Sequence, residues 1–222
     1  NIENHEPGLS KKEISTRSLE MLKLTGIPDP EGCMNKYPHE LSGGMRQRVM
    51  IACAMVTYPK LLIADEPTTA LDVTIQAQII ALMEELQEKT GMSIIIITHD
   101  LGIVADMADE IIIMYAGEIV ERGTARDIFY NQQHPYTWAL LQSVPRIDSE
   151  DKSILNTIEG NIPDMIKPPK GCGFCPRCPY AMEICAEEKP ETVQLTENHS
   201  VSCWLMDERA DRCDVPFGRK NV

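Results

Sequence analysis

The stretch Leu41-Ser42-Gly43-Gly44-Met45-Arg46-Gln47-Arg48-Val49 places a serine and two glycines directly before a segment that we expect to be helical to about Tyr58, where Pro59 ends it. The first backbone N–H groups of a helix have no partner within the helix, and the helix dipole is positive at this end. Glycine lets the backbone approach a phosphate closely, and the serine hydroxyl adds a hydrogen bond. The Ser-Gly-Gly turn (residues 42–44) therefore predicts an anion site, with a simple serine N-cap as the alternative.

The composition limits the classes of partner. The chain has 222 residues, with 21 Lys and Arg against 34 Asp and Glu, a net charge of −13. Such an acidic surface argues against nucleic acid as the main partner. No apolar run approaches the roughly 20 residues that span a bilayer, and no signal-peptide pattern opens the sequence. We therefore expect a soluble or peripheral protein.

The pattern after Pro59 predicts an α/β fold. Residues 61–64 and 93–97 are apolar runs of strand length, which we expect to be strands buried on both faces. Helices are expected after each of them, further strands at 110–115 and 118–121, and two helical pieces over 124–141. Strands that alternate with helices indicate a mainly parallel sheet flanked by helices, with a helical subdomain before it.

Three side chains that could take part in catalysis or metal binding follow the two apolar strands. Asp65 and Glu66 end the first, and His99 follows the second. Ligands gather at the carboxyl ends of parallel strands. There one carboxylate can hold Mg²⁺, the other can orient or deprotonate a water, and a histidine can donate a hydrogen bond to a γ-phosphate. The alternatives are solvated acids and a polar residue at a helix start. Asp72 is expected to be the N-cap of a helix over 73–89 that Gly91 ends, and Ser10-Lys11-Lys12-Glu13 is a capping box that predicts a further helix start.

In this order and at these spacings, the features resemble the nucleotide-binding subunits of ABC transporters. Leu41-Ser42-Gly43-Gly44 resembles their signature motif, Leu61 through Glu66 their Walker B motif, Ala70-Leu71-Asp72 their D-loop and His99 their switch histidine. The oligopeptide/dipeptide permease branch is similar at four further stretches: Tyr37-Pro38-His39-Glu40, Thr98-His99-Asp100-Leu101-Gly102, Met114-Tyr115-Ala116-Gly117 and His134-Pro135-Tyr136-Thr137.

The resemblance implies an ATP-hydrolysing subunit of an importer of oligopeptides or dipeptides. It implies ATP and Mg²⁺ as cofactors, with Asp65 on Mg²⁺ and with Glu66 and His99 as catalytic residues. Ser42, Gly43 and Gly44 would contact an ATP held by a second ABC ATPase subunit, and Asp72 would lie at the interface. Transmembrane permease subunits, docked around residues 10–40, and indirectly an extracytoplasmic solute-binding protein are the other implied partners. The implied location is peripheral, on the cytoplasmic face of the plasma (inner) membrane.

One motif of the family does not occur. The sequence holds no G-x-x-x-x-G-K-[ST] P-loop, so we expect the C-terminal two-thirds of a longer subunit, inactive alone. Residues 1–144 are expected to belong to a nucleotide-binding domain, with the helical subdomain over 1–58 and Walker B to the helices after His99 over 59–144. Residues 145–170 are expected to be a linker and 171–222 a Cys-rich metal-binding extension.

Five of the eight cysteines fall in one short segment of this extension: Cys172, Cys175, Cys178, Cys185 and Cys203. The spacing C-x₂-C-x₂-C is that of a ferredoxin-type iron–sulfur run, whereas four thiolates suit Zn²⁺ equally well. The resemblance favours a 4Fe–4S cluster on Cys172, Cys178, Cys185 and Cys203, with Cys175 as an alternate ligand. Its expected role is structural, because a small segment with few large apolar residues needs such a staple.

Two rival functions stay open from the sequence. One is a stand-alone iron–sulfur or zinc regulatory module, which an upstream coding region without a P-loop would favour. The other is a non-transport ABC ATPase that acts on nucleic acid, which the acidic charge disfavours.

Overall fold

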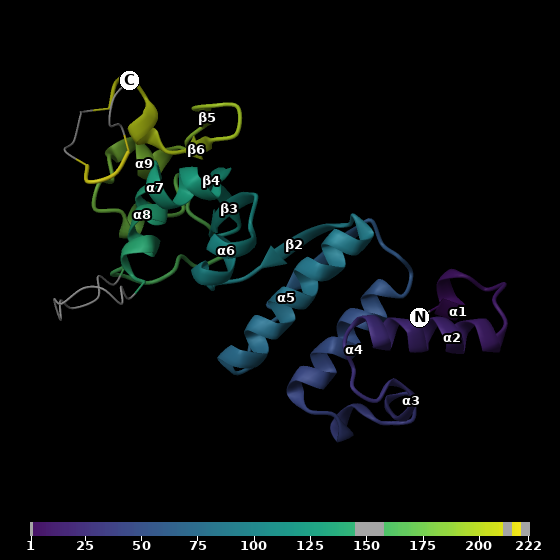
Figure 1. The fold of residues 1–222 in the computed structure, drawn as a ribbon. Coiled ribbons are helices and arrows are strands. Elements are labelled where there is room, and N and C mark those ends of the chain that lie inside the picture. Colours follow the sequence, from purple (N-terminus) through teal and green to yellow (C-terminus); the bar gives the residue numbers. More distant parts are fainter. Residues whose placement is uncertain (1, 145–157, 211–214, 219–222) are drawn as a thin grey trace. The chain divides into compact units, whose positions relative to one another are not determined.

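The computed structural model describes residues 2–144, 158–210 and 215–218. The chain divides into two compact units, residues 1–103 and residues 104–222, and each is described by itself (Figure 1). The expected linker over 145–170 lies partly outside the described residues, and the domain limits expected from the sequence stay predictions. Among the helices that the structure describes, none is long and apolar enough to cross a membrane.

Three long helices form the first unit: α2 (Lys11–Leu24), α4 (Gly43–Met55) and α5 (Val73–Thr90). α4 packs against both α2 and α5. Shorter elements are α1 (Ile2–His5), α3 (Pro30–Cys33) and a 3₁₀ turn at Pro38–Glu40. The long helices begin where the sequence predicts, at the caps Ser10, Ser42 and Asp72. Gly91, with φ +67°, ends α5 as expected.

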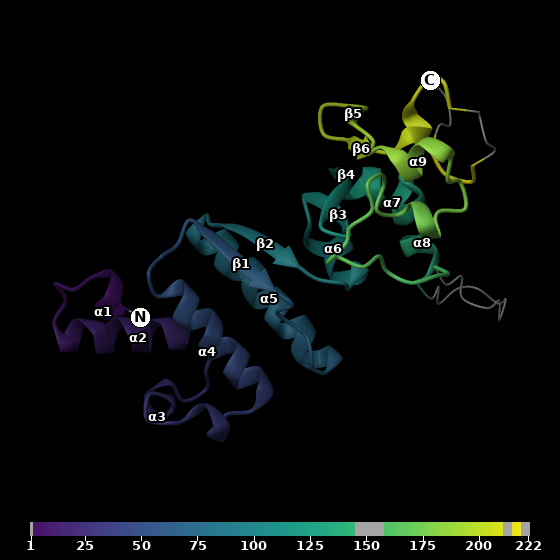
Figure 2. The same ribbon diagram turned by 180° about the vertical axis from the view of Figure 1, so that it is seen from behind.

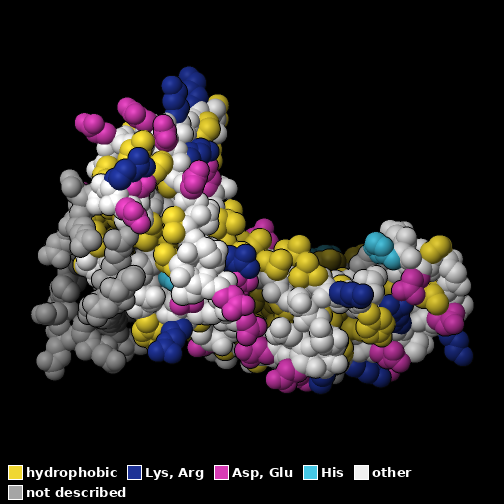
Figure 3. Space-filling model, turned by 90° about the horizontal axis from the view of Figure 1, so that it is seen from above, with side chains coloured by type: hydrophobic (Ala, Val, Ile, Leu, Met, Phe, Trp, Pro, Cys, Tyr) yellow, Lys and Arg dark blue, Asp and Glu magenta, His cyan; other side chains and the backbone are white. Residues whose placement is uncertain are grey.

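Strands β1 (Leu61–Asp65) and β2 (Ser93–Ile97) form a parallel pair that runs along α5 (Figures 1 and 2). The expectation that both strands are buried on both faces is wrong. Alternate side chains of the pair are exposed, among them Ile63 (61%) and Ile97 (50%). The reason is that α5 covers one face, whereas no described element of this unit covers the other. Hydrophobic side chains are visible on the surface in the space-filling view (Figure 3).

The second unit contains an antiparallel sheet of order β3-β4-β6-β5. β3 (Glu110–Tyr115) and β4 (Glu118–Thr124) form the expected hairpin, and β5 (Thr192–Gln194) and β6 (Ser200–Ser202) form a second, unexpected one. The α/β class is therefore confirmed, but a mainly parallel sheet is not: in the described residues only β1 and β2 are parallel. Short turns join the strands of each hairpin, and such turns allow antiparallel pairing only.

The helices of the second unit are short. α6 (Leu101–Met107) starts at the end of the first unit, followed by α7 (Ala125–Tyr130) and α8 (Pro135–Gln142), which confirms the two helical pieces separated at His134-Pro135. The Cys-rich segment adds α9 (Glu183–Glu187) and 3₁₀ turns at Cys175–Arg177 and Trp204–Met206.

The Cys-rich segment shares the hydrophobic core of this unit. Phe174 is buried among the inward side chains of the β3–β4 hairpin, such as Ile113 and Val120, and its ring lies edge-on to Tyr115 at 5.2 Å between centroids. β6 also pairs with β4. The segment is thus packed against the hairpin through both side chains and backbone.

Candidate functional site

Glu66 and His99 meet at the carboxyl edge of the parallel pair. Asp65 and Ile97 are register partners at the ends of β1 and β2, and the Glu66 N–H donates to the Ile97 carbonyl oxygen at 2.8 Å. Nδ1 of His99 lies 2.8 Å from Oε1 of Glu66, and the Thr69 hydroxyl donates to Oε2 of Glu66 at 2.7 Å. The histidine side chain is 80% exposed. The structure therefore brings two of the three expected edge residues into contact, with Asp65 exposed beside them.

The contact favours the charged form of both partners. The hydrogen bonds from His99 and Thr69 lower the pKa of Glu66, and the hydrogen bond to Glu66 raises the pKa of His99. A carboxylate can orient a water and accept its proton. Here, however, each oxygen of Glu66 already accepts a hydrogen bond. Each of these oxygens has a second lone pair, so Glu66 can still accept a hydrogen bond from a water while it keeps both contacts.

The backbone at this edge is strained. Glu66 has φ +49° and Ala70 has φ +64°, a region that costs a residue with a side chain about 1–2 kcal/mol. Hydrogen bonds from Thr69 N–H to Glu66 O and from Leu71 N–H to Thr68 O close the turn between them, each at 3.2 Å. Strain of this kind clusters at functional sites, which favours the interpretation of Glu66 as a functional acid over a solvated one. The sequence pattern alone does not predict this backbone strain at Glu66 and Ala70.

The Ser-Gly-Gly turn starts α4 and packs against the start of α5. The Ser42 hydroxyl accepts the Met45 N–H at 3.3 Å, so the N-cap alternative applies to this side chain. A Cβ on Gly44 would lie only 2.9 Å from Cγ2 of Ile75. A side chain at position 44 would therefore force Ile75 to move, so the packing favours glycine there. Ser42 and Gly43 are exposed, and their contact with an anion stays a prediction.

Asp72 is also a helix cap. Its Oδ1 accepts the Ile75 N–H at 3.0 Å, and Asp72 is exposed at the N-terminal end of α5. The predicted place of Asp72 at a subunit interface is compatible with this exposure but is not tested by a single chain.

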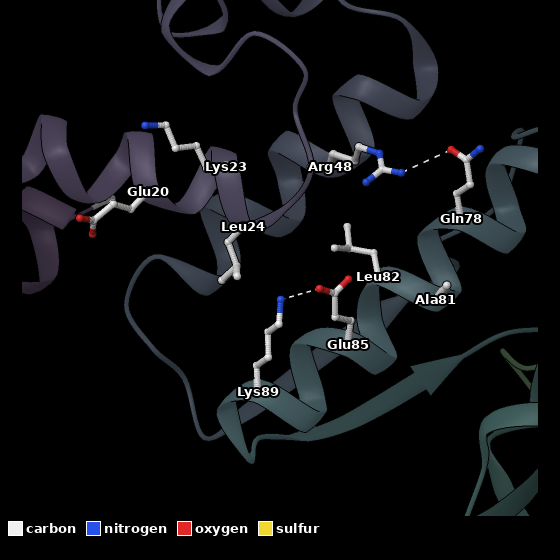
Figure 4. Close-up of a pocket in the computed structure, with 10 residues that line it drawn as sticks. Glu20, Lys23, Leu24, Arg48, Gln78, Ala81, Leu82, Glu85 and Lys89 are labelled. Carbon is white, nitrogen blue, oxygen red and sulfur yellow. Dashed lines mark hydrogen bonds and ion pairs between the residues drawn. The ribbon is translucent and has the colours of Figure 1, made fainter.

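A groove of the first unit lies between α2, α4 and α5 (Figure 4). Arg48 donates to the Thr25 carbonyl oxygen at 2.8 Å, and Lys89 pairs with Glu85 within the groove. None of the predicted site residues lines it. The groove is therefore separate from the edge that carries Glu66 and His99.

The five clustered cysteines line one small cavity of the second unit, together with His134 and Phe174. All five are free thiols. Burial, assisted by the neighbouring thiols, raises the pKa of Cys178 and of Cys203 to about 12. In the described part of the chain, no three His, Cys, Asp or Glu side chains are placed to hold a metal ion. The structure therefore does not support the expected metal-binding module.

A buried polar cluster beside this cavity was not predicted. The Glu121 carboxylate on β4 is fully buried and accepts hydrogen bonds from Gln133 N–H (2.6 Å), His134 N–H (3.1 Å) and His199 Nε2 (2.9 Å). It connects β4, the α7–α8 loop and the β5–β6 hairpin. The only sequence signal is that a glutamate occupies an inward position of a strand, which becomes readable once the strand pairing is known.

The comparisons with known proteins agree with these motifs. Residues 2–69 match the model of the ABC transporter family, and residues 120–185 match that of the oligopeptide/dipeptide transporter C-terminal region. Oligopeptide transport ATP-binding protein OppD of Bacillus subtilis is 53% identical over 208 residues, which are 94% of this chain and 58% of the relative. Dipeptide transport ATP-binding protein DppD of Haemophilus influenzae is 58% identical over 190 residues, 86% of this chain and 57% of the relative.

A solved structure supports the fold. CbiO1 of Clostridium perfringens, described as part of the ABC transporter complex cbiONQ, superposes with a TM-score of 0.50 at 37% identity over 57% of this chain and 49% of its own. The chain spans a little under three fifths of the length of the two curated relatives above. By sequence, this chain is thus similar to the ABC transporter family over residues 2–69 and to the oligopeptide/dipeptide transporter C-terminal region over residues 120–185.

Proposed function

We propose that this chain is part of the ATP-hydrolysing subunit of an ABC importer that energises the uptake of oligopeptides or dipeptides. The observation that carries the proposal is the contact between Glu66 and His99 at the carboxyl edge of β1 and β2, in a chain whose relatives are named oligopeptide and dipeptide transport ATP-binding proteins. The partners are a second ABC ATPase subunit, transmembrane permease subunits and, indirectly, an extracytoplasmic solute-binding protein. The chain would lie peripherally on the cytoplasmic face of the membrane.

Each residue of the edge has one task in this mechanism. Asp65 would hold Mg²⁺, and the ion would neutralise charge on the phosphates of ATP. His99 holds Glu66 through Nδ1 and, because its ring is exposed, has Nε2 available to donate to a γ-phosphate. Glu66 orients the attacking water and accepts its proton, because each of its oxygens has a lone pair beside the one that bonds His99 or Thr69. The protein thus contributes positioning and charge stabilisation to an in-line attack.

The Ser-Gly-Gly turn serves the ATP of the second subunit. The free N–H groups at the start of α4 and the Ser42 hydroxyl face solvent beside the start of α5. The γ-phosphate of an ATP bound to the P-loop of the second subunit would accept hydrogen bonds from these donors, as anions do at helix N-termini. Asp72, next to this turn in the fold, would contact the same partner.

Mixing this chain with DppD of Haemophilus influenzae tests the proposal by sedimentation. We expect association that requires ATP and is not supported by ADP. Ser42→Arg should abolish it, because the new side chain fills the anion site. Ser10→Arg is the matched control, since it removes the other serine N-cap of the first unit at an equal cost in capping. Association without ATP, or equal association of the Ser42→Arg chain, would overturn the proposal.

We further propose that the Cys-rich segment holds a thiolate-bound metal group, a 4Fe–4S cluster or else Zn²⁺, that stabilises its fold. Every pair among Cys172, Cys178, Cys185 and Cys203 lies close enough for one thiolate to disfavour ionisation of the other. A bound cation would reverse this repulsion and stabilise the thiolates. The backbone supports the same grouping, because Cys172 N–H donates to the Cys185 carbonyl oxygen at 2.8 Å.

Metal analysis of protein purified without oxygen decides this second proposal. Iron and sulfide in the ratio of a 4Fe–4S cluster would identify the cluster, and stoichiometric zinc would identify the alternative. Protein that contains neither iron nor zinc would overturn the proposal. Cys178→Ser should remove the metal, whereas Cys53→Ser, outside the segment, should retain it. Cys175→Ser tests the alternate ligand: retention of the metal excludes Cys175 from the ligand set.

A further inference from the structure

The loop that carries His99 is tied to α5 through Asp100. Gln76, in the first turns of α5, donates from Nε2 to Oδ2 of Asp100 at 2.9 Å. The other oxygen of Asp100 accepts the N–H groups of Gly102 (2.9 Å) and Ile103 (3.4 Å) at the start of α6. The Asp100 side chain therefore connects the β2–α6 loop both to the start of α6 and, through Gln76, to α5.

Gln76 is itself fixed relative to Asp72. Its backbone N–H donates to the Asp72 carbonyl oxygen at 2.8 Å, and the Asp72 side chain caps the same helix. Because this i→i−4 hydrogen bond joins the two residues within the first turn of α5, we expect a displacement of Asp72 to displace Gln76 as well. Contacts thus run without a break from Asp72 to Asp100, whose neighbour His99 holds Glu66.

We propose that Gln76 is a positioning residue for His99: its hydrogen bond to Asp100 keeps His99 against Glu66 and transmits movements of Asp72 to that pair. The inference rests on the proposed function, in which Asp72 contacts the second subunit and His99 serves ATP. It adds a residue that lies in none of the motifs by which the chain resembles its family. A partner subunit that moves Asp72 would then change the hydrogen bond between His99 and Glu66. Dimer formation and this acid–histidine pair are thereby coupled within one chain.

The test needs no nucleotide and uses the chain as it is. Nitrogen NMR of its five histidines, with His99 assigned by His99→Gln, gives the shift of Nδ1 at one fixed pH. The part of this shift that depends on Glu66 is obtained by comparison with Glu66→Gln. Gln76→Glu sets a second carboxylate against Asp100 and is expected to remove most of the Glu66-dependent part. Gln76→Ala, which deletes the hydrogen bond without adding charge, is expected to do the same.

Rescue separates positioning from general stability. Adding Asp100→Asn to Gln76→Glu should restore the Glu66-dependent shift to that of Asp100→Asn alone, because the new amide donates to the new carboxylate while its oxygen still caps α6. Gln78→Glu is the matched control, since it adds the same charge on α5 at a side chain that contacts Arg48 instead. The inference is overturned if Gln76→Glu leaves the Glu66-dependent shift intact, or if Asp100→Asn fails to restore it. Failure of ATP-dependent association with DppD would leave these shifts unchanged, so the two proposals fail separately.

Discussion

Replacing Glu121 by alanine is expected to destabilise residues 104–222 by about 3–5 kcal/mol. The fully buried carboxylate accepts three hydrogen bonds, from Gln133 N–H, His134 N–H and His199 Nε2. A buried donor left without a partner costs about 1–3 kcal/mol, so three donors amount to about 3–9 kcal/mol. The lower part of this range applies, because the truncation opens polar space in which a water can accept some of these bonds.

Urea unfolding followed by tryptophan fluorescence measures this free energy. Both tryptophans of the chain, Trp138 and Trp204, lie in the second unit, so the signal reports on that unit. Glu118→Ala on the same strand is the matched control, because Glu118 forms a surface ion pair with Lys189 that is worth about 1 kcal/mol or less. If Glu121→Ala costs no more than Glu118→Ala, the reasoning about the buried cluster is wrong.

Further predictions concern the first unit. Gly91→Ala should cost about 1 kcal/mol, because alanine is strained at φ +67° although nothing lies within 4 Å of its new methyl group. Gly8→Ala, where the space is equally open and φ is not positive, should be neutral or slightly stabilising in the same circular-dichroism melts. The pKa of His99, measured by NMR titration, should lie above its ordinary value of 6.5 and return toward it in Glu66→Gln. Because the folded-state pKa of His99 is raised and that of Glu66 is lowered, the stability that this pair adds should fade as the pH rises through the pKa of His99 and as it falls through that of Glu66. A pH-independent stability difference between wild type and Glu66→Gln would contradict this.

Local signals were readable from the sequence, and distant pairing was not. The caps Ser10, Ser42 and Asp72 act within four residues of themselves, so their side-chain chemistry predicts where helices begin. Glu121 and His199 are far apart in the sequence, and the hydrophobic periodicity of the chain does not predict that they are in contact. The same limit explains the error at β1 and β2. An apolar run shows that a strand can be buried on both faces, but only the elements packed against it decide whether it is.

The candidate site divides in the same way. Position after an apolar strand was enough to select Glu66 and His99, because the carboxyl ends of parallel strands share an edge. The hold of Gln76 on Asp100 depends on how α5 lies beside β2, which a single sequence does not specify. The five cysteines were readable as a cluster by spacing, whereas the arrangement of their thiols around a cavity required the packing of Phe174 against the β3–β4 hairpin.

Hydrogen exchange at the backbone amides of residues 42–45 tests the central claim most directly, that the Ser-Gly-Gly turn grips an ATP held by another subunit. Measured on this chain mixed with DppD of Haemophilus influenzae, exchange of these amides should slow when ATP is added and should not slow with ADP. Exchange rates that are the same with and without ATP, in a mixture shown to contain the complex, would contradict the account.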